Sequence, residues 1–245
     1  GSAAIIADDF DWKISPGVVP AAKKPVTFTF SINWKKNKKP LTDLEIVHEK
    51  PCHLLIVSRD LKEFQHIHPD VKSPGKMDVT TEFPKAGQYR MYMQFYVKNL
   101  GEYTIIKDFE VGPGHVKTPL AKLTVDLAPK KVDQFTMTLM SPPHQTNASR
   151  IMEVGISADG KPIENIQSYL GAGGHGVMIR EDLSQFLHIH PMFKMAQGLD
   201  YTSPVKFLAN VPEPGKYRAW MQFQINGKIE IGIWDIEIKP APKEE

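Results

Sequence analysis

Short runs of alternating apolar and polar residues recur along the whole chain, and they are rich in β-branched and aromatic side chains. Glycine, proline, asparagine and aspartate separate these runs, and no stretch shows the sustained 3.6-residue apolar period of a helix. The pattern therefore predicts β-strands throughout. In the first half of the chain the predicted strands are 26–34, 52–58, 63–68, 88–97 and 104–111.

The second half of the chain repeats the motifs of the first half. The stretch "FQHIHP" (64–69) matches "FLHIHP" (186–191), and "AGQYRMYMQF" (86–95) matches "PGKYRAWMQF" (214–223). The second copy carries a short insertion between its two blocks, near "MFKMAQGLD". Repeated groups of short strands, each group spanning roughly 110 residues, are typical of β-sandwiches. We expect an all-β protein made of two tandem immunoglobulin-like or cupredoxin-like sandwiches.

Glycine, proline and lysine mark the junction between the two copies. The segments "GPGHVKTPL" (112–120) and "APKK" (128–131) interrupt the strand pattern. The sequence predicts a first sandwich over 1–118, a linker or linking strand over 119–130 and a second sandwich over 131–245.

Composition narrows the possible partners and the cellular location. The formal net charge is +2, so nothing in the sequence favours nucleic acid. No apolar run approaches the ~18 residues that span a bilayer. The single cysteine, Cys52, cannot form an internal disulfide. The opening Gly-Ser pair is typical of a cloning scar, which is compatible with the removal of a leader or lipid anchor.

The histidines of the first copy lie in a predicted β-hairpin. The stretch 52–69 predicts a strand, a tight turn centred on Asp60 and Leu61, and a second strand, so that 55 faces 66 and 53 faces 68. Because side chains alternate between the two faces of a strand, His53, His66 and His68 share one face. A register slip of one residue would separate them.

The second copy predicts the same hairpin, with His175, His188 and His190 on one face. Three neutral imidazoles around one point favour a transition metal, and the absence of carboxylates from the group disfavours calcium and magnesium. Surface or cavity histidines preserved by duplication are the alternative. The remaining histidines, His48, His115 and His144, have no match in the other copy and are expected in solvated loops or at strand ends.

Two matched methionines influence the choice of metal. Met93 and Met221 occupy the same place in the "MQF" block of each copy, and a thioether is a soft ligand that favours Cu(I). A strand methionine can equally fill core space. The sequence predicts copper first and zinc second. The predicted ligands are His53, His66, His68, Met93, His175, His188, His190 and Met221.

These blocks resemble those of bacterial extracytoplasmic proteins with YtkA-like and FixH-like domains. The resemblance rests on His-x-His-Pro and on the Pro-x-x-Gly-x-Tyr-Arg block, and it covers both copies. It implies an immunoglobulin-like fold, a periplasmic or cell-surface location with a lipid or membrane tether, and a role in heavy-metal or copper handling. It also implies the six matched histidines as ligands.

Three functions stay open from the sequence. The leading hypothesis is a copper-binding carrier, sequestration or resistance protein that has one site per domain or one shared site, and that passes metal to a protein partner. The alternative is a scaffold or adhesion module without functional metal. A zinc-binding protein or a copper metalloenzyme is the second alternative. The metalloenzyme ranks last, because an enzyme needs an acid, base or nucleophile beside the metal, and Asp70, the only nearby carboxylate, has no match in the second copy.

Overall fold

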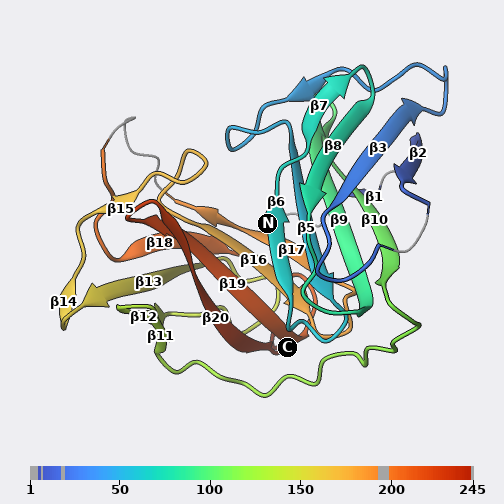
Figure 1. Cartoon of the computed structure of the whole chain (residues 1–245). Helices are drawn as coiled ribbons and strands as arrows, with labels where there is room; N and C mark the ends of the chain where they lie inside the picture. Colours follow the sequence, from blue (N-terminus) through green and yellow to red (C-terminus); the bar gives the residue numbers. More distant parts are fainter. Residues whose placement is uncertain (1–4, 7, 18–19, 193–198, 244–245) are drawn as a thin grey trace. The chain divides into compact units, whose positions relative to one another are not determined.

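The computed structural model describes residues 5–6, 8–17, 20–192 and 199–243, without the side chains of Ile5, Ile6 and His190. The chain divides into two compact units, Ala4–Ala121 and Lys122–Glu245, which we call the N-terminal unit and the C-terminal unit. All described regular secondary structure is β-strand, which confirms the all-β prediction (Figure 1). Among the described residues there is no apolar helix of membrane-spanning length.

The N-terminal unit is built from two sheets. One has the order β1-β10-β9-β5-β6, with β4 also paired to β9, and the other has the order β2-β3-β8-β7. This is the strand arrangement of an immunoglobulin-like sandwich. The strands are β1 (Ile5–Ile6), β2 (Phe10–Ser15), β3 (Val26–Trp34), β4 (Leu44–Glu45), β5 (Cys52–Ser58), β6 (Phe64–Ile67), β7 (Asp70–Ser73), β8 (Lys76–Thr81), β9 (Gly87–Val97) and β10 (Gly101–Val111).

The core of this unit lies between its two sheets. Side chains alternate between the two faces of a strand, and every second residue of β3 enters the core. Phe28, Phe30 and Ile32 are buried, whereas the residues between them are only partly buried. The other sheet contributes Leu54 and Ile56 from β5. Burial of such apolar side chains, at about 25 cal/mol per Å², is the main stabilising contribution to the sandwich.

The C-terminal unit repeats this plan, except that its strands form one continuous sheet path. The order is β11-β12-β13-β18-β17-β16-β19-β15, with β14 paired to β13 and β20 paired to β19. The strands are β11 (Lys130–Val132), β12 (Phe135–Met140), β13 (Arg150–Ala158), β14 (Lys161–Pro162), β15 (Ile166–Gln167), β16 (His175–Arg180), β17 (Phe186–Pro191), β18 (Val205–Ala209), β19 (Gly215–Ile225) and β20 (Lys228–Ile238).

The repeated Gly-x-Tyr-Arg block forms the same corner in both units. The Tyr89 hydroxyl donates to the Lys85 carbonyl oxygen at 2.7 Å, and the Tyr217 hydroxyl donates to the Glu213 carbonyl oxygen at 2.7 Å. A tyrosine that bonds back to the backbone a few residues upstream is a hallmark of immunoglobulin-like sandwiches. Burial raises the pKa of both phenols to about 12.

The His-x-His-Pro stretch marks where the chain leaves one sheet for the other. In the N-terminal unit β6 and β7 are separate strands in different sheets. In the C-terminal unit β17 is continuous, and it pairs with β16 through Gly176–Ile189 and with β18 through His190–Leu208. The predicted insertion falls largely on 193–198, which lie outside the described residues.

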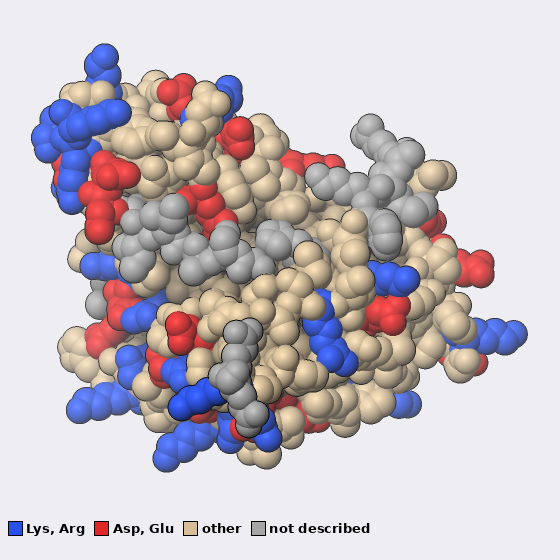
Figure 2. Space-filling model, turned by 180° about the vertical axis from the view of Figure 1, so that it is seen from behind, with Lys and Arg blue, Asp and Glu red and all other residues tan. Residues whose placement is uncertain are grey.

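Charged side chains of both signs lie on the face of the molecule that Figure 2 draws. On the face seen in Figure 2, blue and red groups are interspersed, with one blue cluster at the upper left. This distribution agrees with the small net charge of +2.

Candidate metal centre

The histidine hairpin has the register that the sequence predicts. Leu55 pairs with His66, and Val57 pairs with Phe64, as expected for a turn centred on Asp60 and Leu61. In the C-terminal unit Val177 pairs with His188. The predicted pairings of Leu55 with His66, Val57 with Phe64 and Val177 with His188 are therefore confirmed.

The turn fixes this register through side-chain hydrogen bonds. Ser58 Oγ donates to Asp60 Oδ1 at 2.6 Å, and the Glu63 amide donates to Ser58 Oγ at 2.9 Å. Leu61 adopts a left-handed backbone with φ of 58°, as Leu183 does with 67°. An aspartate that bonds the backbone two residues ahead pre-forms such a turn, here through the Lys62 amide at 3.2 Å.

His53 on β5 is the most buried histidine of the N-terminal group, with 3% exposure. Its Nε2 lies 2.8 Å from the Val47 carbonyl oxygen. Because a carbonyl only accepts, Nε2 carries the proton and Nδ1 carries a lone pair. Burial lowers the pKa of His53, the Val47 hydrogen bond partly raises it, and the charge of Lys50 lowers it further, so the ring is neutral at pH 7.

The structure brings the three predicted histidines of this unit together. One donor atom from each of His53, His66 and His68 lies within 4.8 Å of the other two. The His53 Nδ1 and His66 Nε2 atoms are 3.4 Å apart. The ring centroids are separated by 5.7 Å for His53 and His66, 5.1 Å for His53 and His68, and 4.8 Å for His66 and His68. We call these three residues the histidine cluster.

A fourth histidine, His48, lies beside the histidine cluster, and it sits in a turn and is partly exposed, as expected for a loop position. The ring centroid of His48 is 6.0 Å from that of His53. His48 sits in a tight turn in which Val47 and Lys50 exchange backbone hydrogen bonds. Sequence periodicity gives no information about such a turn, and Leu170 occupies the matching place in the second copy.

The C-terminal unit reproduces the anchoring of the buried histidine. His175 is 6% exposed, and its Nε2 lies 2.6 Å from the Tyr169 carbonyl oxygen. His188 is half-buried on β17. The side chain of His190 lies outside the described residues, so the predicted second cluster stays a prediction.

The structure corrects the prediction that Met93 and Met221 are ligands. Met93 pairs with Leu54 and lies in the core between the sheets, whereas His53 pairs with Gln94 on the other face. Met221 likewise pairs with Gly176 and packs in the core of the C-terminal unit. The glutamine of each "MQF" block, and not its methionine, therefore shares the histidine face.

Cys52 lies on the face opposite His53, as its neighbouring position on the strand predicts. It is fully buried in the core, and burial raises the pKa of its thiol to about 12. Cys52 is therefore a protonated packing residue and not a thiolate ligand.

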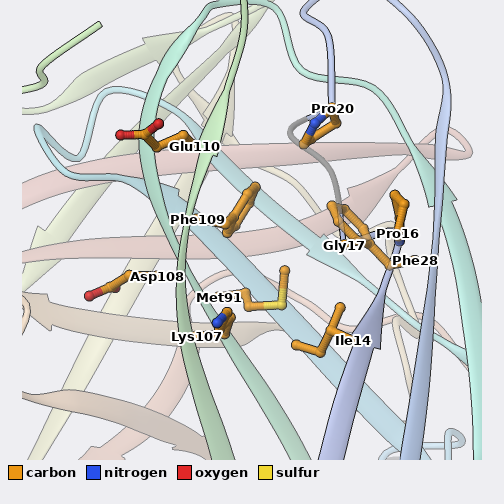
Figure 3. Close-up of a pocket in the computed structure, with 10 residues that line it drawn as sticks. All are labelled: Ile14, Pro16, Gly17, Pro20, Phe28, Met91, Lys107, Asp108, Phe109 and Glu110. Atoms are coloured by element: carbon orange, nitrogen blue, oxygen red, sulfur yellow. The ribbon is translucent and has the colours of Figure 1, made fainter. Parts of the chain in front are cut away.

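A separate cavity of about 290 Å³ opens between β2, β3, β9 and β10 (Figure 3). Ile14, Phe28 and Phe109 line it with apolar surface. Two carboxylates at its rim are already engaged, Asp108 by the Arg90 guanidinium and Glu110 by His115 Nδ1 at 2.9 Å. No residue of the histidine cluster lines this cavity.

Several solved structures match the chain at low similarity. Fibronectin(III)-like modules of Clostridium thermocellum CbhA are 13% identical, with 96% of this chain and 97% of that chain covered and a TM-score of 0.25. The Escherichia coli adhesin FdeC is 11% identical, with 96% and 65% covered and a TM-score of 0.30. No curated protein sequence matches the chain.

One family model matches the chain twice, over residues 4–117 and 130–239. Its description is "Domain of unknown function (DUF8832)". The two matches fall on the two copies of the internal repeat.

Proposed function

The chain belongs to the family described as Domain of unknown function (DUF8832), in both of its halves, and we propose that its N-terminal unit binds a transition-metal ion through the histidine cluster. The proposed ion is copper, with zinc as the alternative. Sequestration or transfer of the ion is the proposed role, with a protein partner on the receiving side. The resemblance to YtkA-like and FixH-like proteins adds an extracytoplasmic, tethered location to this proposal.

The observation that carries the proposal is the spacing of the imidazole nitrogens. Four nitrogens bound at about 2.0–2.1 Å around a tetrahedral ion are roughly 3.3 Å apart. The 3.4 Å between His53 Nδ1 and His66 Nε2 matches this separation. His68 offers a donor atom within 4.8 Å of both, so a small side-chain rotation completes a three-nitrogen site.

The anchoring of His53 supports the same proposal. Histidine ligands usually donate their second ring N–H to a carbonyl or carboxylate, which fixes the tautomer and orients the lone pair. His53 does this with the Val47 carbonyl oxygen, which leaves Nδ1 as the ligand atom. His175 repeats the arrangement with Tyr169, which extends the proposal to a second site in the C-terminal unit.

Copper is ranked before zinc because of the general preferences of these ions for nitrogen ligands. Divalent copper binds a given nitrogen site more tightly than zinc does. A site of three imidazoles with a fourth position is also a common zinc site. Without Met93 in the ligand set, the thioether argument for Cu(I) no longer applies.

Metal titration of matched variants tests the proposal. His66→Ala combined with His68→Ala leaves one imidazole, so copper affinity of the N-terminal unit should be lost. His115→Ala is the control, because His115 is in the same unit, is highly exposed and contacts Glu110 outside the histidine cluster. Chelator competition at neutral pH measures the copper affinity of the double variant and of the control. Equal affinities for the double variant and the wild type would refute the proposed site.

A further inference from the structure

We infer that His48 is a fourth imidazole ligand of the ion bound by the histidine cluster. Leu170 stands at the matching position of the C-terminal unit, so a metal site in that unit would keep one coordination position open. The inference rests on the proposed function, and it gives the two units different roles in metal handling.

The turn that carries His48 is tied to the buried histidine of the cluster. Val47 and Lys50 exchange two backbone hydrogen bonds around His48 and Glu49. The Val47 carbonyl oxygen also accepts the hydrogen bond from His53 Nε2 at 2.8 Å. This bond holds the residue at position 48 next to the histidine cluster.

The C-terminal unit builds the same turn with a different residue. Tyr169 and Ala172 exchange the two backbone hydrogen bonds, and the Tyr169 carbonyl oxygen accepts from His175 Nε2 at 2.6 Å. Leu170 has nearly the same backbone conformation as His48, with φ of 52° against 49°. Because a leucine is accommodated in this turn, the turn itself does not require a histidine at position 48.

The spacing of the rings places His48 within reach of the same ion. Four imidazoles bound at about 2.0–2.1 Å around a tetrahedral ion have ring centroids roughly 5.2 Å apart. The centroids of His48 and His53 are 6.0 Å apart, compared with 5.7 Å for His53 and His66, whose nearest nitrogens already have ligand spacing.

The His48 side chain must rotate to bind the ion. Its nitrogens are not in the set of donor atoms that lie within 4.8 Å of one another, which comes from His53, His66 and His68. The His48 ring is partly exposed, so solvent lies on one side of it and packed core does not surround it. His53 is therefore the fixed ligand of the site, and His48 is the ligand that closes over the ion.

A fourth nitrogen changes what the site can do. Zinc sites with four protein ligands are closed, whereas sites with three protein ligands leave a position for water or another molecule. Imidazole suits copper as well as zinc. The N-terminal unit therefore retains its ion without a bound water. A site of three histidines in the C-terminal unit offers an open position, where a ligand from a receiving partner can enter.

Replacement of His48 by leucine tests the inference in the full-length chain, and the Leu170 turn indicates that this variant folds. A background of His188→Ala with His190→Ala removes two of the three predicted ligands of the C-terminal unit. Chelator competition with Zn(II) and Cu(II) then measures the N-terminal site. We expect His48→Leu to weaken binding by about tenfold or more, because even groups that only support a metal ligand cost about 10–100-fold when they are removed.

His115→Leu in the same background is the matched control, because it also replaces a histidine of this unit by leucine, away from the histidine cluster. Its affinity should equal that of the background protein. Equal affinity in a folded His48→Leu protein would overturn the inference and leave the histidine cluster standing as a three-ligand site. A wild type that binds neither zinc nor copper would overturn the proposed function as well.

Spectroscopy separates a ligand from a residue that only supports the site. Cu(II) electron paramagnetic resonance in ¹⁷O-enriched water detects a water molecule in the equatorial plane of the ion. We expect no ¹⁷O broadening in the background protein and clear broadening in His48→Leu, where water takes the vacant position. Broadening in both proteins, or in neither, would overturn the assignment of His48 as a ligand even if the affinity fell.

Discussion

Met93 provides a direct test of which face of β9 carries the metal site. The side chain is fully buried in the core between the sheets, on the face opposite His53. Truncation to alanine removes buried methylene and sulfur contacts and leaves a cavity, which costs about 2–5 kcal/mol for this kind of substitution. Substitution by leucine conserves volume and should cost less than about 1.5 kcal/mol. Neither change should alter the affinity for copper in either oxidation state.

The assay combines thermal unfolding of the metal-free protein with chelator competition. A loss of about 3 kcal/mol in the N-terminal unit lowers its Tm by roughly 10 °C, which separates Met93→Ala clearly from Met93→Leu. The decisive comparison is between the Cu(I) affinity of Met93→Leu and that of the wild type. If Met93→Leu remained as stable as expected but bound Cu(I) at least tenfold more weakly than the wild type, the thioether would reach the ion and the placement of Met93 in the core would be wrong.

Two further predictions concern pH and the hairpin turn. The pKa of His53 is lowered in the folded state relative to its unfolded value of ~6.5, so the unfolded chain binds more protons in this range. The free energy of unfolding should therefore fall as the pH drops from 7 through the folded pKa of His53. Denaturant titrations of the metal-free protein should show a smaller fall for His53→Gln than for the wild type. Asp60→Ala removes two hydrogen bonds in the turn, and it should cost about 1–2 kcal/mol and weaken metal binding in the N-terminal unit. The control Asp182→Ala changes the matching turn of the C-terminal unit, and equal metal affinity in the Asp60→Ala and wild-type proteins would show that the turn does not position the histidines.

Much of the fold follows from local sequence patterns. The strand Val26–Trp34 and the strand Cys52–Ser58 have the predicted bounds, because alternation and flanking turn residues define them. The pairing of Leu55 with His66 also follows from the sequence, since a short turn leaves little freedom in register. These features depend on residues that are close together in the chain.

Long-range pairing was the source of the errors. The offset between β5 and β9 decides whether Met93 or Gln94 faces His53, and these strands are far apart in sequence. A shift of one residue exchanges the two faces, so the motif "MQF" alone cannot identify the ligand. The place of His48 beside His53 was also not predicted, because it depends on the local tight turn between Val47 and Lys50.

The affinity of the wild type for copper and zinc, measured beside the His66→Ala and His68→Ala double variant, tests the central claim most directly. Isothermal titration at neutral pH should show tight binding to the wild type and to His115→Ala, with one site lost in the double variant. Affinity should also fall as the pH drops through ~6.5, because the imidazoles must be deprotonated to bind. Absence of copper and zinc binding to the folded wild type at neutral pH would contradict the account.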